Sequence, residues 1–171
     1  MLLEELALFL KVFLITILFT SALLKAYSYK DFINTLEQLK FRKIYARVIS
    51  ILILTYEMTI AILLMFRKMI IAEVMLITLL IMFSFGVIRA RKIGKKIRCN
   101  CFGKLTDEFF GLNTIFHILV MLTATVILYL NNDLLLSNSS FFNYIMSVLT
   151  SLGIILIYAL INQLFKYKVM E

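Results

Sequence analysis

The chain contains no proline, and only 16% of its 171 residues are charged. Hydrophobic residues make up 63% of the chain, and its mean hydropathy is +0.99. Ordinary soluble domains are only roughly half apolar, so this composition excludes that class of protein. The apolar residues form continuous runs instead of alternating with polar ones, which indicates helices that cross a lipid bilayer.

Metal ligands and cofactor motifs are also scarce. One histidine and two cysteines are too few for the four ligands of a structural zinc site unless protomers combine, so we expect no metal site. Nothing resembles a nicotinamide-, flavin- or haem-binding motif, so electrons in a redox reaction would pass to another protein or to a lipid-soluble quinone. The net charge of +8 does not indicate nucleic-acid binding, because the cations flank the apolar runs, as they do beside lipid headgroups.

Five apolar runs approach the length of about 20 residues that spans a bilayer. They cover roughly residues 6–26, 46–66, 69–89, 112–131 and 141–165. We predict an all-α polytopic membrane helix bundle, with a four-helix core in residues 1–131. Residues 132–171 would add a polar loop, a fifth transmembrane helix and a basic tail. The first run opens with glutamates instead of the cations of a signal peptide, so we interpret it as a retained helix.

The connection between the first two runs, residues 30–45, has the spacing of a short amphipathic helix on the membrane surface. Lysines and arginines concentrate in this connection, in the third connection and after the last run. Because the side richer in these cations is normally cytoplasmic, we expect a multi-pass protein of the cell membrane with its N-terminus outside. Its C-terminus and its cysteines would then lie inside.

Cys99 and Cys101 are the only cysteines and are separated by a single residue. A disulfide across one residue closes a very small ring with strained geometry, which favours thiol–disulfide exchange over a structural role. Neighbouring positive charge favours the reactive thiolate. The same connection is rich in cations, namely Arg89, Arg91, Lys92, Lys95, Lys96, Arg98 and Lys104.

Ionisable residues inside the spans are costly and therefore informative. Glu57 lies near the middle of the second run, so we expect it to face the bundle interior, neutral or paired with a cation or hydroxyl. Lys11 and Glu73 are placed to pair between the first and third helices. His117 begins the fourth run on the cysteine side, where it is either a hydrogen-bonded interfacial residue or a base for a thiol.

Together these features resemble the methylamine-utilisation MauE family, within the broader DoxX-like group of redox-associated membrane proteins. The resemblance rests on four helices, Lys25 in Ser-Ala-Leu-Leu-Lys, Glu57, and the motif Cys-Asn-Cys-Phe-Gly at residues 99–103. It implies a four-helix membrane bundle that handles thiols and disulfides to support maturation of a partner protein. It carries over the cysteine pair, Lys25 and Glu57 as site residues, with thiol–disulfide oxidoreductase-like activity.

The chain departs from the family pattern in its fifth span and at Asn100, where glycine is common. Exported substrates would also favour external cysteines, whereas the cation distribution places them inside. Two other hypotheses stay open: a noncatalytic membrane subunit that stabilises or assembles a partner, and a small transporter with Glu57 in its pathway.

Overall fold

The computed structural model describes residues 2–66, 69–94, 97, 112–130 and 141–169. Within these ranges the chain forms helices and no strands, which confirms the predicted all-α class. The helices are α1 (Leu2–Tyr27), α2 (Tyr29–Gln38), α3 (Lys43–Met65), α4 (Met69–Ile93), α5 (Leu112–Leu130) and α6 (Phe141–Val169).

Four helices contain segments long and apolar enough to cross a membrane. These segments are Glu5–Tyr27, Lys43–Met65, Ile70–Ile93 and Phe142–Ile161. The described part of α5, Thr114–Leu130, is a shorter apolar helix. The lateral faces carry many exposed apolar side chains, such as Leu52, Ile81 and Leu156, as lipid contact requires. The prediction of a multi-pass helical membrane protein is confirmed.

Hydroxyl side chains within the long helices donate hydrogen bonds to backbone carbonyls of their own helix. Lipid offers no partners for polar groups, so a hydroxyl inside a span needs an internal acceptor. Such bonds to the carbonyl four residues earlier are made at 2.7–2.9 Å by Thr16, Thr59, Thr78, Ser84, Thr125 and Thr150. These residues therefore fit the spans without requiring a ligand.

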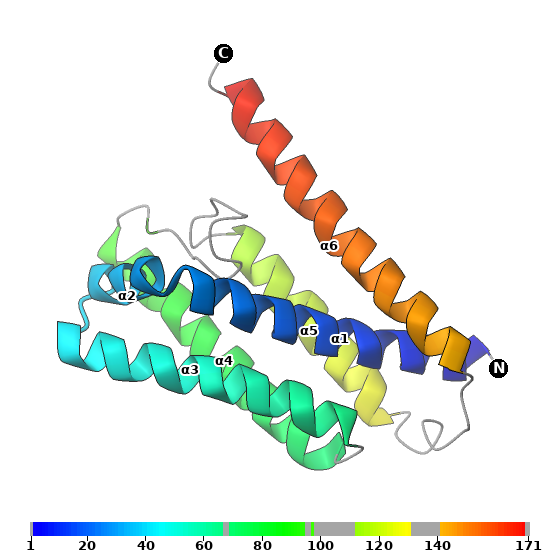
Figure 1. The fold of residues 1–171 in the computed structure, drawn as a ribbon. Helices are drawn as coiled ribbons and strands as arrows, with labels where there is room; N and C mark the ends of the chain where they lie inside the picture. Colours follow the sequence, from blue (N-terminus) through cyan, green and yellow to red (C-terminus); the bar gives the residue numbers. More distant parts are fainter. Residues whose placement is uncertain (1, 67–68, 95–96, 98–111, 131–140, 170–171) are drawn as a thin grey trace.

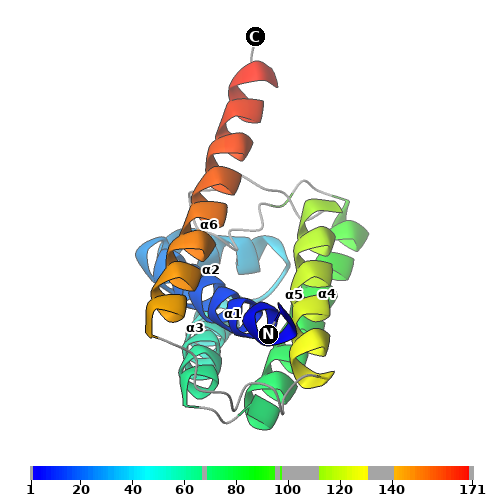
Figure 2. The same ribbon diagram turned by 90° about the vertical axis from the view of Figure 1, so that its right-hand side faces the viewer.

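The bundle is organised around α1, which packs against α3, α5 and α6, while α4 packs against α3 and α5 (Figures 1 and 2). Successive core helices run in alternating directions, so the C-terminal ends of α1 and α4 and the start of α3 gather near α2 (Figure 1). The main apolar core joins α1, α3, α4 and α5. Its fully buried leucine and isoleucine side chains include Leu14, Leu18, Ile60, Leu64, Leu76, Leu79 and Leu128.

The predicted amphipathic helix is present as α2. Its apolar side chains Phe32 and Leu36 are buried in a second cluster with Ile53 of α3 and Ala90 of α4. The apolar face of α2 therefore packs on protein, and the location of this helix at the membrane surface stays a prediction. The face packs on the ends of neighbouring helices because the tight turn after α2 folds it back over them.

A Schellman motif ends α2: Lys40 adopts φ 65°, and the Phe41 amide donates to the Leu36 carbonyl at 3.2 Å. Arg89 of α4 stabilises this helix corner, the turn at Leu39–Phe41 between α2 and α3. Its Nε donates to the Leu39 carbonyl at 2.8 Å, and its guanidinium lies 4.5 Å from the centroid of the Phe41 ring. Arg89 thus connects the end of α4 to the turn between α2 and α3.

The additional helix α6 crosses α1, and its C-terminal half extends away from the other helices (Figures 1 and 2). Among the described residues of α6, only Ser151 is fully buried. A small residue lets two helices approach closely, so Ser151 marks the crossing with α1. The predicted fifth span is confirmed as a helix outside the four-helix core.

We predict that Arg89→Met lowers the free energy of unfolding by about 1–3 kcal/mol, because it removes a hydrogen bond from a charged donor and a cation–π contact. Thermal unfolding followed by circular dichroism in detergent micelles measures the change. Arg91→Met is the matched control, since Arg91 is exposed on the same helix. Equal melting temperatures for the two variants would contradict the proposed stabilising role of Arg89.

Candidate functional site

The segment with the cysteines joins α4 to α5. Cys99 and Cys101 lie outside the described residues, so their reactivity stays a prediction. Ile97, two residues before Cys99, is buried in the cluster that contains Phe32 of α2. On the other side, Leu112 begins α5. The chain is therefore anchored at Ile97, in the cluster that also contains Phe32 of α2.

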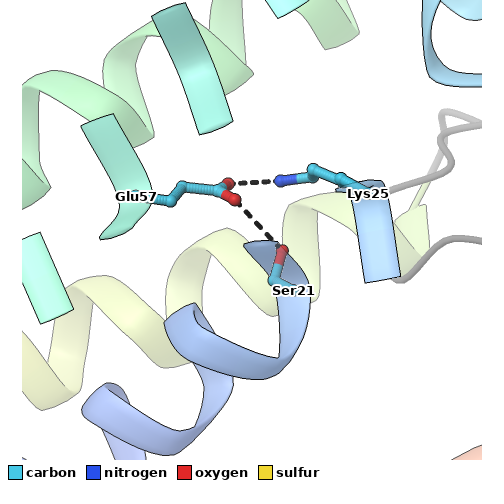
Figure 3. A network of polar contacts seen from close by, with 3 residues as sticks. All are labelled: Ser21, Lys25 and Glu57. Atoms are coloured by element: carbon cyan, nitrogen blue, oxygen red, sulfur yellow. Dashed lines mark hydrogen bonds and ion pairs between the residues drawn. The ribbon is translucent and has the colours of Figure 1, made fainter. Parts of the chain in front are cut away.

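Beside this cluster, a buried polar network connects α1 to α3. The Lys25 ammonium donates to Oε1 of Glu57 in an ion pair, and Ser21 Oγ donates to Oε2 of Glu57 at 3.5 Å (Figure 3). Ser21 and Lys25 are four residues apart, which places both on one face of α1. Lys25 lies in the last turn of α1, but helical side chains tilt toward the N-terminus, so its ammonium reaches back into the bundle.

The ion pair is almost completely removed from solvent, with Lys25 and Glu57 0% and 1% exposed. Removing charges from water costs several kcal/mol per ion, and the opposite charge must offset that cost. Two aromatic rings also stabilise the buried ammonium, because Lys25 Nζ lies 4.9 Å from the centroid of the Phe83 ring and 5.6 Å from that of Phe32. Each charge therefore depends on the other to remain buried.

This geometry confirms the inward position and pairing expected for Glu57. It corrects the interpretation of Lys25 as a cation that flanks the first connection, because its side chain is buried and paired. Arg89 likewise contacts Leu39 and Phe41, so it belongs to the helix corner. A catalytic role for Lys25 or Glu57 stays a prediction.

A second polar pair joins α5 to α6. His117 Nε2 and the Tyr158 hydroxyl share a hydrogen bond of 2.8 Å, and their rings meet edge to face with centroids 5.0 Å apart. Which group donates depends on the histidine tautomer. The hydrogen-bonded interpretation of His117 is thus confirmed, while its role as a base for a thiol stays a prediction.

One cavity of about 230 Å³ joins both polar pairs. It lies among α1, α4, α5 and α6, with Glu57 reaching it from α3. Phe13 and Phe83 contribute aromatic walls, and most of the remaining lining is aliphatic. Lys25, Glu57, His117 and Tyr158 all contribute to the lining. The arrangement combines an apolar chamber with a few polar groups, the usual construction of a small-molecule site.

With this geometry established, comparison with known proteins identifies the family. Residues 3–130 match the family described as Methylamine utilisation protein MauE. The chain belongs to this family. No curated protein and no solved structure matches the chain. The MauE family match ends with α5, so α6, which supplies Tyr158 to the cavity, lies beyond it.

The predicted pairing of Lys11 with Glu73 is wrong for this MauE family member. Both side chains are buried, but neither carboxylate oxygen of Glu73 has a hydrogen-bond partner among the described residues. The reason is the packing order, since α1 packs against α3, α5 and α6 instead of closely against α4. Within the described ranges, no group of three or more histidine, cysteine, aspartate or glutamate residues could hold a metal ion.

Sequence analysis missed two features of the site. It did not select Lys25 as the partner of Glu57, although Lys25 was a candidate site residue through the MauE resemblance. A buried carboxylate near the middle of a span is stabilised by a cation, and the helical spacing of Ser21 and Lys25 was the available signal. It also missed Tyr158, for which the sequence carries no signal, because only the crossing of α6 over the bundle brings it to His117.

We predict that Lys25→Met and Glu57→Met each destabilise the protein by about 3–5 kcal/mol, because each leaves one buried charge without its partner. The double variant should recover most of that loss, since two apolar side chains replace the pair. Thermal unfolding in detergent micelles gives the double-mutant cycle. Lys30→Met, at an exposed lysine, is the control. Additive losses would show that the pair is not coupled.

Proposed function

We propose that this MauE family membrane protein is a thiol–disulfide accessory protein, in which Cys99 and Cys101 exchange electrons with a partner protein that requires disulfides. The observation that carries the proposal is the Cys-Asn-Cys motif in the segment between α4 and α5. Membership in a family of methylamine utilisation proteins supports an accessory role, and the inferred kinship with the DoxX-like group favours redox chemistry.

The exchange proceeds through a mixed disulfide. A thiolate of the partner attacks one sulfur of the oxidised Cys99–Cys101 pair, and the other cysteine leaves as a thiolate. The second thiolate of the partner then attacks the mixed disulfide, which forms the partner's disulfide and releases the reduced pair. The partner loses two electrons, and Cys99 and Cys101 gain them.

The structure supports this chemistry through the surroundings of the cysteine segment. Ile97 is buried two residues before Cys99, so the chain leaves the bundle from an anchored position just before the cysteines. The first connection at that end of the bundle exposes further cations, namely Lys30, Lys40, Arg42, Lys43 and Arg47. Their charge adds to that of the cysteine connection and favours the thiolate form.

The proposed orientation in the cell membrane keeps the cysteine end in the cytoplasm and the N-terminus outside. Lys25 and Arg89 no longer contribute to the cation bias, because their side chains are engaged within the bundle. The remaining lysines and arginines still concentrate at the cysteine end, against Arg67 and Lys68 at the opposite connection. The cation distribution therefore continues to favour an inward cysteine pair.

We predict that a membrane-impermeant maleimide labels the cysteines only after reduction and only after the cells are opened. The mass shift of the wild type compared with Cys99→Ser and Cys101→Ser reports redox state and sidedness together. Asn100→Ser is the matched control, since it changes the same segment but keeps both thiols. Either cysteine variant should abolish oxidation of the partner, while Asn100→Ser and membrane insertion are unaffected.

Four outcomes would overturn parts of this proposal. Labelling of intact cells after reduction would place the pair outside and reverse the orientation. A pair that stays fully reduced under oxidant challenge would overturn the redox function, as would full activity in both serine variants. A partner that accumulates only when this protein is present, but without need of either thiol, would establish the noncatalytic assembly subunit instead.

A further inference from the structure

The cavity shared by the Lys25–Glu57 and His117–Tyr158 pairs has no part in the exchange between Cys99, Cys101 and a partner. We infer that it binds the ring of a lipophilic quinone, which takes up the electrons that the cysteine pair receives. The electron-transfer step rests on the proposed thiol–disulfide function. Binding of the ring rests on the cavity alone.

The size of the cavity suits a single substituted ring. Its volume is about 230 Å³, whereas an apolar protein cavity of about 150 Å³ is enough to bind benzene. A six-membered ring with several small substituents therefore fits.

The cavity also reaches the lateral surface of the bundle. Phe116 of α5 and Ile154 of α6 both line it, yet they are 64% and 46% exposed. Outside these residues lies the hydrocarbon region of the bilayer. A ligand dissolved in the membrane can therefore enter between α5 and α6 while an apolar tail stays in the lipid.

The polar groups on the cavity wall are mainly hydrogen-bond donors. Lys25 borders the cavity but is 0% exposed, so its ammonium acts on a ligand through its positive charge and not through a direct hydrogen bond. Thr114 and Tyr158 also line the cavity, and the Tyr158 hydroxyl shares a hydrogen bond with His117. The main acceptor is the carboxylate of Glu57, and it already accepts hydrogen bonds from Lys25 and Ser21. The complementary ligand is thus one that offers acceptors, such as the two carbonyl oxygens of a quinone.

The aromatic lining fits a flat ring as well. Phe13, Phe83 and Phe116 belong to the wall, and aromatic side chains stack favourably with planar rings. A saturated lipid chain gains nothing specific from these rings or from the donors. The combination of flat aromatic surface and donor groups therefore selects a quinone over an acyl chain.

The electron balance agrees with this choice. When the reduced Cys99 and Cys101 form their disulfide, they release two electrons and two protons. A quinone that becomes a quinol takes up two electrons and two protons. The hydrogen bond between His117 and Tyr158 provides a proton relay beside the ring. No further oxidant is needed for the pair to be oxidised again.

The test uses the full chain in lipid nanodiscs free of quinone, titrated with decylubiquinone by isothermal calorimetry. We expect saturable binding, at least tenfold tighter than that of decylbenzene, which has the same tail but no carbonyl groups. Equal affinities for the two compounds would overturn the proposal, because the cavity would then recognise apolar bulk alone. Absence of saturable binding would overturn it too.

Two matched variants on α6 locate the site. Ile155 lines the cavity, whereas Ile157 is 59% exposed and lies outside the lining. Ile155→Trp should weaken decylubiquinone binding at least tenfold by filling the chamber, while Ile157→Trp leaves it unchanged. Tyr158→Phe should weaken it about fivefold, as expected for the loss of one hydrogen bond. Equal effects of the two tryptophans would place binding elsewhere.

A variant with both Cys99→Ser and Cys101→Ser separates this inference from the proposed function. It should bind decylubiquinone like the wild type, because the described lining already supplies the aromatic rings and polar side chains on which binding of the ring depends. In the wild type, added decylubiquinone should reoxidise the reduced cysteine pair, and Ile155→Trp should slow this at least tenfold. Binding without reoxidation would overturn the electron transfer alone, whereas thiol exchange without quinone binding would overturn the cavity inference alone.

Discussion

The buried ion pair between Lys25 and Glu57 is the constraint on which the arrangement of the bundle depends. It joins α1 to α3 where water is absent, and neither charge is tolerable there without the other. The pair therefore sets the relative position of these two helices. Phe83 then brings α4 against the Lys25 ammonium, so three core helices meet at one charged centre.

The same end of the bundle holds the helix corner and Ile97, which precedes the cysteines by two residues. Arg89 fastens α4 to the turn after α2, and Ile97 packs into the cluster below that turn. These contacts connect to the ion pair through Phe32, which belongs to the same cluster as Ile97 and whose ring centroid lies 5.6 Å from Lys25 Nζ.

The additional helix α6 completes a cavity that the four-helix core does not form alone. The match to the MauE family ends at residue 130, yet the cavity includes Ile155 and Tyr158 of α6. Because α6 crosses α1 at Ser151 and leaves α5 largely uncovered, it closes one side of the chamber and keeps a path to the lipid. The appended span thereby converts a surface of the core into a site.

The sequence alone determined the membrane class, the helices and the inward position of Glu57, neutral or paired, because backbone groups and charges in lipid must find internal partners. It also identified the cysteine motif, whose chemistry depends on neighbours in the chain. Only the tertiary structure decided which cation meets Glu57, that α2 packs on protein, and that Glu73 does not pair with Lys11. Those outcomes depend on which helices become neighbours, and similar apolar faces allow several packing orders that sequence periodicity cannot distinguish.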